Sequence, residues 1–148
     1  MRKIDKIETT LYRLPLPEAV EAASSGVMSD LDMVMVRLWD TDGVEGCGYN
    51  PLFTNQGPTL VEIINNVCAD IVMQEDPSRI EWIWHRMWRQ LHAGRGAPVS
   101  FAIAAVDTAL WDLKANSLGQ PLWRLLGGFN PEVRAYACLL YTSDAADE

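Results

Sequence analysis

The sequence has no apolar run near the roughly 20 residues that a membrane-spanning helix needs. Its N-terminus, Met-Arg-Lys-Ile-Asp-Lys, lacks the apolar core of a signal peptide. A basic stripe is also missing, and the net charge of −8 argues against nucleic-acid binding. Cysteines are few: Cys47, Cys68 and Cys138 are odd in number and widely spaced, which argues against a disulfide framework. These absences favour a cytoplasmic protein that binds neither membrane nor nucleic acid.

What the chain does contain is enough for one domain: it has 148 residues, and 49% of them are apolar. The stretch 97–128 organises the rest. No Gly or Pro interrupts 99–118, which predicts a long helix that Gly119 ends, and Pro121 opens a short second helix. The long helix has a face of small residues and a face of large ones, and we interpret it as packed on two sides, with a second body missing. The two faces comprise Ala102, Ala105 and Ala109, and Ile103, Val106, Leu110 and Leu113.

The first third of the chain predicts a three-stranded antiparallel meander. Residues 4–13 alternate as a strand, and the prolines within 14–17 are expected to end it. Residues 18–31 are then a long loop of the kind found in functional lids. Two further strands, 33–40 and 44–49, flank a Thr-Asp-Gly turn. Glycines at 46 and 48 thin the last strand, which indicates close approach by another backbone.

Helices follow the strands. Thr59 and Glu62 have the spacing of a capping box that opens a helix over 59–72. Asp76 and Pro77 predict the start of the next helix, which the apolar spacing extends to residue 91. The order is β-β-β-α-α-α, an α+β fold in which a small helical bundle packs on one face of the meander.

The long helix also carries a family signature. Residues 102–115 read Ala-Ile-Ala-Ala-Val-Asp-Thr-Ala-Leu-Trp-Asp-Leu-Lys-Ala, and residues 119–127 read Gly-Gln-Pro-Leu-Trp-Arg-Leu-Leu-Gly. This pattern resembles the signature of the mandelate racemase and muconate-lactonizing group of the enolase superfamily. Asn116 departs from it, because that position usually holds Lys, Arg or Gln.

The resemblance implies that residues 1–128 are the enolase-like N-terminal capping domain, and that residues 129–137 begin the first strand of a (β/α)-barrel. A barrel needs roughly 200 residues or more, so we expect the barrel domain to be missing. Residues 138–148 resemble translated sequencing-adapter read-through, and we expect them to be a non-native tail.

In this family the barrel supplies the carboxylates that hold Mg²⁺ and the Lys or His bases that remove a proton α to the substrate carboxylate. The resemblance therefore implies no catalytic residue and no metal ligand in this fragment, which we expect to be inactive. The parent enzyme would be a Mg²⁺-dependent lyase or isomerase acting on a small carboxylate, either an acid-sugar dehydratase or a 2-hydroxy-acid racemase. We also expect the parent to be a homo-oligomer.

What the fragment keeps, on this resemblance, is substrate specificity. In the family, two loops of the capping domain close over the barrel mouth, and they correspond here to residues 18–31 and 50–57. The candidate substrate-binding residues are Ser24, Ser25, Val27, Met28, Phe53 and Thr54.

Two alternatives stay open. The chain could be a standalone α+β module that binds a partner without catalysis. Asp107, Trp111 and Lys114, at i, i+4 and i+7, could form an interdomain polar contact or an ordinary set on one helix face.

Overall fold

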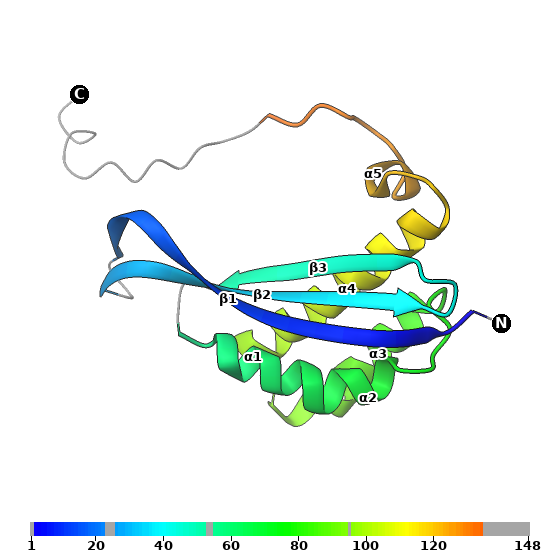
Figure 1. The fold of residues 1–148 in the computed structure, drawn as a ribbon, viewed down its shortest axis with the longest axis horizontal. Coiled ribbons are helices and arrows are strands. Elements are labelled where there is room, and N and C mark those ends of the chain that lie inside the picture. The colour runs from blue at the N-terminus through cyan, green and yellow to red at the C-terminus, as the bar shows by residue number, and fades with distance from the viewer. Residues whose placement is uncertain (1, 23–25, 53–54, 95, 135–148) are drawn as a thin grey trace.

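The computed structural model describes residues 2–22, 26–52, 55–94 and 96–134. It shows an antiparallel sheet with helices on one face (Figure 1), which confirms the predicted α+β class. The strands, in the spatial order β1-β2-β3, are β1 (Ile4–Ala22), β2 (Gly26–Asp40) and β3 (Glu45–Leu52). The helices are α1 (Gly57–Ile63), a π-helical turn (Ile64–Cys68), α2 (Ala69–Val72), α3 (Ile80–Gln90), a 3₁₀ turn (His92–Gly94), α4 (Ala97–Ser117) and α5 (Leu122–Leu125).

Alternation along β2 separates the two faces of the sheet. Val34, Val36 and Leu38 are fully buried in the core between sheet and helices. The residues that alternate with them, such as Met33 and Met35, lie on the opposite face, which is only half-buried. This period of two is what a sheet covered on one side requires.

The first hairpin is much longer than the sequence predicted. The expected end of the first strand at the prolines is wrong, and so is the expected loop over 18–31. The β1–β2 ladder runs to the pair Pro15 and Asp30, passes an irregularity, and resumes with Val20 opposite Met28. Because β1 is an edge strand, a proline can be accommodated at the irregularity without disrupting a central ladder. The resulting arm extends past the helical layer (Figure 1).

The start of α1 also differs from the prediction. The helix begins at Gly57, so Thr59 lies inside it, and no side-chain cap comes from the N-cap residue Gln56. The prediction of a capping box formed by Thr59 and Glu62 is therefore wrong. The N–H of Gly57 instead donates to Oδ2 of Asp32 on β2, at 3.2 Å. Asp32 lies on a strand that is distant from α1 in the chain. A local sequence pattern therefore cannot indicate that its carboxylate caps this helix.

The start of α3 was likewise predicted too early. Asp76 and Pro77 do not open the helix, which begins at Ile80. Oδ1 of Asp76 accepts the N–H of Ser78 at 2.9 Å, and its carbonyl oxygen accepts the N–H of Arg79 at 3.0 Å. These bonds close a separate turn in front of the helix.

Helix α4 spans Ala97–Ser117, within two residues of the predicted stretch 99–118, and Gly119, with φ of +60°, follows its end as expected. The inference that one of its apolar faces lacks a partner is wrong. α4 contacts β3 and β2 as well as α1 and α3, and both the small and the large apolar residues are buried. The two faces of α4 are thus satisfied within this domain.

The contact between β3 and α4 is a close approach of two backbones, which confirms the reading of the two strand glycines. A Cβ at Gly48 would clash with the carbonyl oxygen of Ala105, and one at Gly46 with that of Ala109. α4 also supplies partners for polar groups of β3. The N–H of Cys47 donates to Oδ2 of Asp112 at 2.8 Å. Nδ2 of Asn116, the residue that departs from the family pattern, donates to the carbonyl oxygen of Glu45 at 2.9 Å.

We expect Gly48→Ala to lower the free energy of unfolding by about 3 kcal/mol, because a methyl group there must push strand and helix apart. Urea denaturation of the purified chain measures this. Gly94→Ala is the matched control: its Cβ would meet nothing closer than 3.9 Å, and the change should stay within about 0.5 kcal/mol. Equal denaturation midpoints for Gly48→Ala and the unmodified chain would contradict the close-approach account.

Candidate functional site

Two segments leave the sheet at the same end, and they form the candidate site. The first is the arm, residues 14–31, made by the extension of β1 and β2. The second is the segment 53–56, which joins the end of β3 to α1; residues 53 and 54 of this segment and residues 23–25 of the arm lie outside the described residues. Leu52, the last residue of β3, pairs with Asp32 at the base of the arm. Both segments therefore start from one place on the sheet (Figure 1).

The structure describes two of the six predicted substrate-binding residues. Val27 lies in the arm and is 70% exposed. Met28 is half-buried and pairs with Val20 across the arm. Ser24, Ser25, Phe53 and Thr54 lie outside the described residues. Contact of any of the six with a substrate stays a prediction.

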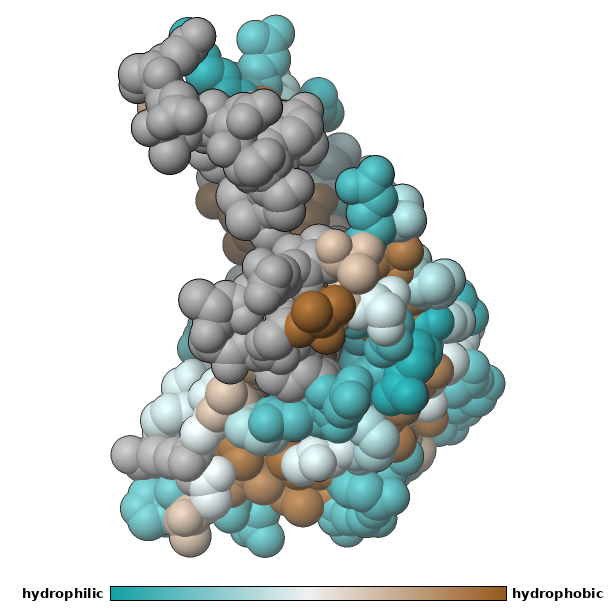
Figure 2. Space-filling view, turned by 90° about the vertical axis from the view of Figure 1, so that its left-hand side faces the viewer, coloured by the Kyte–Doolittle hydropathy of each residue, from teal (hydrophilic) through white to brown (hydrophobic). Residues whose placement is uncertain are grey.

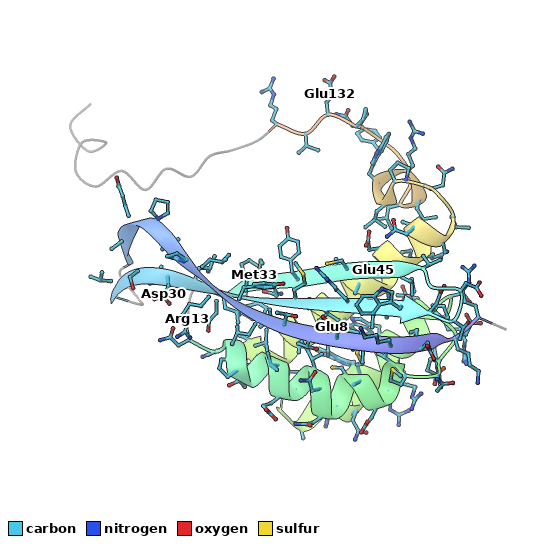
Figure 3. All side chains as sticks on the ribbon, in the orientation of Figure 1. Glu8, Arg13, Asp30, Met33, Glu45 and Glu132 are labelled. Atoms are coloured by element: carbon cyan, nitrogen blue, oxygen red, sulfur yellow. The ribbon has the colours of Figure 1, made fainter. Side chains whose placement is uncertain are left out.

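A network of charged groups lies at the base of the arm. Asp32 is only 2% exposed. Its Oδ1 accepts a hydrogen bond from Nε of Arg13 at 3.0 Å, and its Oδ2 accepts the N–H of Gly57 at 3.2 Å. Nε of Arg13 also lies 3.7 Å from Oδ1 of Asp30 (Figure 3). The hydrogen bond to Asp32 and the negative charge of that residue raise the pKa of Arg13.

Sequence reasoning missed this network, although a signal for it exists. Asp32 continues the period-two series of Val34, Val36 and Leu38, so it occupies a position on the buried face. Asp40 ends the same series at the far end of β2. It accepts the N–H groups of Asp42 and Val44, at 3.0 and 2.9 Å. A carboxylate at a core-facing strand position requires a hydrogen-bond partner. The positions of Asp32 and Asp40 therefore predict that each carboxylate binds donors at its end of the core.

The surface at the arm end is chemically mixed. Figure 2 shows this end of the molecule, where apolar areas lie among hydrophilic ones. The exposed apolar residues include Leu14 and Val27 on the arm and Tyr49 on β3. On the sheet face opposite the helices, Met33 lies near the arm, while Glu8 and Glu45 lie farther from it (Figure 3). Such a surface can contact both the carbon skeleton and the polar groups of a ligand.

The set formed by Asp107, Trp111 and Lys114 on α4 is only partly brought together. Nζ of Lys114 lies 4.9 Å from the centre of the Trp111 ring, a cation–π contact. Asp107 is half-buried, and burial raises its pKa, with the negative charge of Glu81 on α3 adding to the shift. The charged form of Asp107 is therefore disfavoured by its surroundings.

This shift predicts a pH dependence of stability. A carboxyl group whose pKa rises on folding binds its proton more tightly in the folded chain. The free energy of unfolding therefore falls as the pH rises from the ordinary value of 3.8 through the raised value. Asp107→Asn should remove this part of the dependence, so the variant should be more stable than the unmodified chain at pH 7 and equally stable near pH 3.

Urea denaturation at a series of pH values measures the effect. Asp70→Asn, at an exposed position of α2, is the control and should change stability by no more than about 0.5 kcal/mol. A variant Asp107→Asn that is less stable than the unmodified chain at pH 7 would show that the charged carboxylate contributes favourably.

The described part of the chain offers little catalytic chemistry of its own. Within it, no three His, Cys, Asp or Glu side chains are grouped to hold a metal ion. Burial raises the pKa of the Cys68 thiol to about 12 and also raises that of Cys47, so neither thiol is activated as a nucleophile. No helix in the described ranges is long and apolar enough to cross a bilayer.

The arrangement defines the class of protein as an α+β domain in which helices cover one face of a three-stranded antiparallel meander. Residues 6–127 match the family model described as the mandelate racemase / muconate lactonizing enzyme, N-terminal domain, and the chain belongs to this family.

Curated relatives include a cycloisomerase and a member of a dehydratase family. A 3,6-anhydro-α-L-galactonate cycloisomerase from Streptomyces coelicolor is 40% identical over 135 residues, which is 90% of this chain and 37% of the cycloisomerase. A D-galactonate dehydratase family member from Marinomonas is 35% identical over 101 residues, 68% of this chain and 25% of that protein.

Solved structures agree with these relatives. A racemase from Streptomyces coelicolor with bound magnesium has a TM-score of 0.84 at 40% identity, covering 86% of this chain and 36% of the racemase. An L-talarate dehydratase from Polaromonas, complexed with magnesium and L-glucarate, has a TM-score of 0.78 at 28% identity, covering 86% of this chain and 35% of the dehydratase. The chain thus spans only 25 to 37% of the length of these relatives.

Proposed function

We propose that this chain is the substrate-specificity domain of an enzyme that removes a proton α to the carboxylate of a sugar acid. The parent reaction is a dehydration or an isomerisation, which includes racemisation and cycloisomerisation. The 40% identity to a cycloisomerase supports this proposal most strongly, because it extends over 90% of the chain. The dehydratases among the relatives share the same substrate class.

In this proposal the catalytic groups belong to the rest of the longer protein. The described residues provide no grouped metal ligands, so we assign none of them a role in holding magnesium. The magnesium in the two related structures supports a metal-dependent parent, with ligands outside this chain. We accordingly propose that this chain alone has no activity.

The work of the chain would then be to enclose the substrate. In this proposal the arm and the segment 53–56 would cover the active site of the parent enzyme, exclude water from it and contact the part of the substrate away from the reacting carbon. Val27, exposed on the arm, and Met28 beside it offer apolar contact to the carbon skeleton. The predicted positions 24, 25 and 54 would add hydroxyl groups that suit a hydroxylated ligand.

One observation favours the alternative of a standalone binding module: both apolar faces of α4 are covered within this domain. Solution behaviour alone therefore cannot separate the two proposals. Several exposed apolar side chains beyond α4 favour the capping role, because a packed partner would cover them. These residues are Leu118, Trp123, Leu126, Phe129 and Val133. Assembly of the parent into homo-oligomers stays a prediction.

A chimera tests the proposal directly. Residues 1–127 of this chain replace the equivalent part of the Streptomyces coelicolor cycloisomerase, and activity is measured on a panel of sugar acids. We expect a folded chimera that turns over at least one of them. Met28→Ala and Val27→Ala in the chimera should raise KM about tenfold with kcat within about threefold, because they remove binding contacts and no reacting group.

Trp82→Ala is the control. Trp82 is exposed on α3, in the helical layer, and its loss should leave KM unchanged. Circular dichroism and gel filtration establish that the chimera is folded. A folded chimera that turns over no sugar acid would contradict the proposed function. Equal effects of the Trp82 and Met28 substitutions would contradict the assignment of the arm to substrate binding.

A further inference from the structure

We propose that a cavity at the end of the sheet opposite the arm binds a small polyhydroxylated molecule, either a neutral polyol or a sugar acid. The cavity has a volume of about 280 Å³, near the lower end of the range for ligand pockets, roughly 300–1,000 Å³. It lies where the start of β1, the end of β2, the turn before α3 and the last turns of α4 meet. The polar residues that line it are Arg2, Asp40, Asp76, Ser78, Lys114 and Ser117.

This cavity is separate from the candidate site described above. The strand β2 runs from Asp32 at the base of the arm to Asp40 at the cavity, and this length of strand spans about 26 Å. The start of β1 and the arm accordingly lie at opposite ends of the molecule (Figure 1). The inference therefore does not rest on the proposed function.

A buried carboxylate at the cavity indicates a ligand. The side chain of Asp40 is fully buried, and its Oδ1 accepts the N–H groups of Asp42 and Val44. Its Oδ2 has no hydrogen-bond partner among the described residues. Nε of Arg2 lies 3.2 Å from this oxygen, but the hydrogen bond of that group goes to Oδ2 of Asp42, at 2.8 Å. Because an unsatisfied buried acceptor is costly, a ligand that brings a donor to Asp40 would be favoured.

The charges around the cavity favour hydroxyl groups over a cation. The charge of Asp40 is already balanced by Arg2, and Asp76 and Lys114 add one charge of each sign. A hydroxyl group both donates and accepts, so it can donate to Asp40 while it accepts from Lys114. The side chain of Arg2 is 38% exposed, so it can shift to admit a hydroxyl group without disturbing the core.

The rest of the lining suits a carbon skeleton. Leu113, which is 1% exposed, and Pro77, which is also buried, form an apolar part of the wall. The hydroxyl-bearing residues Ser78 and Ser117 lie beside them in the lining. A chain of hydroxylated carbons presents C–H groups to an apolar surface and hydroxyl groups to a polar one, as this lining requires.

An NMR titration of the full chain with galactitol and with D-galactonate tests the proposal. We expect saturable shifts of the amides of residues 40–42, 76–78 and 113–117, with a Kd on the order of 1 mM. Equal binding of both compounds would assign recognition to the hydroxyl groups alone. Tighter binding of D-galactonate would add a contact of its carboxylate with Lys114 or Arg2. Either result supports the site.

Two substitutions locate the binding. Ser78→Phe places a large side chain at an exposed position of the lining and should weaken binding of both compounds at least about tenfold. Asp40→Asn keeps an oxygen for the two N–H groups of the turn but replaces Oδ2 by a donor, and should weaken binding about tenfold. Ser100→Phe is the matched control, because Ser100 is exposed in the first turn of α4, at the other end of that helix from the cavity. Its binding should equal that of the unmodified chain.

The remaining outcomes overturn the proposal. They are the absence of saturable shifts with both compounds, shifts confined to residues away from the cavity, and binding to Ser78→Phe as tight as to the unmodified chain. Unchanged binding to a folded Asp40→Asn would overturn the role of its Oδ2 as the acceptor. Ser78→Phe keeps the test decisive if Asp40→Asn does not fold, because the side chain of Ser78 is exposed. No result depends on activity, so failure here leaves the proposed function untouched.

Discussion

The fold depends on the close approach of β3 and α4. Glycines at 46 and 48 remove the side chains that would separate the two backbones, and Ala105 and Ala109 keep the facing side of the helix flat. Asp112 then reaches the N–H of Cys47, so a polar group of an edge strand is bonded rather than left for another chain. Because α4 also contacts α1 and α3, this single contact sets the position of the sheet relative to the whole helical layer.

Buried carboxylates mark the two ends of the core-facing part of β2, residues 32–40. Asp40 closes the turn between β2 and β3, and Asp32 joins the arm to α1. Between them the same face of β2 is entirely apolar. A carboxylate in such a position tolerates little movement of its partners, because the alternative is an unpaired buried charge. The core thus holds the middle of the sheet, and directional polar contacts define its ends.

This division of labour suits the role in substrate specificity that we propose. The described part of the arm extends past the helical layer, so it contributes little to the core (Figure 1). Residues there, such as Val27, can vary with the substrate without disturbing the packing of β3 on α4. A family with one type of chemistry and many substrates needs such a separation, because catalytic groups must stay in place while the contacts around the substrate change.

Sequence alone determined the class of fold, the three-stranded meander, the extent of α4 and the close approach at Gly46 and Gly48, because periodicity, helix stop signals and glycine placement act over a few residues. The family signature in α4 identified the domain for the same local reason. Only the tertiary structure decided that the prolines do not end β1, that α4 is covered on both sides, and that α1 is capped by Asp32. Each of these depends on a partner distant in the chain, and a local pattern carries no information about which partner will be there.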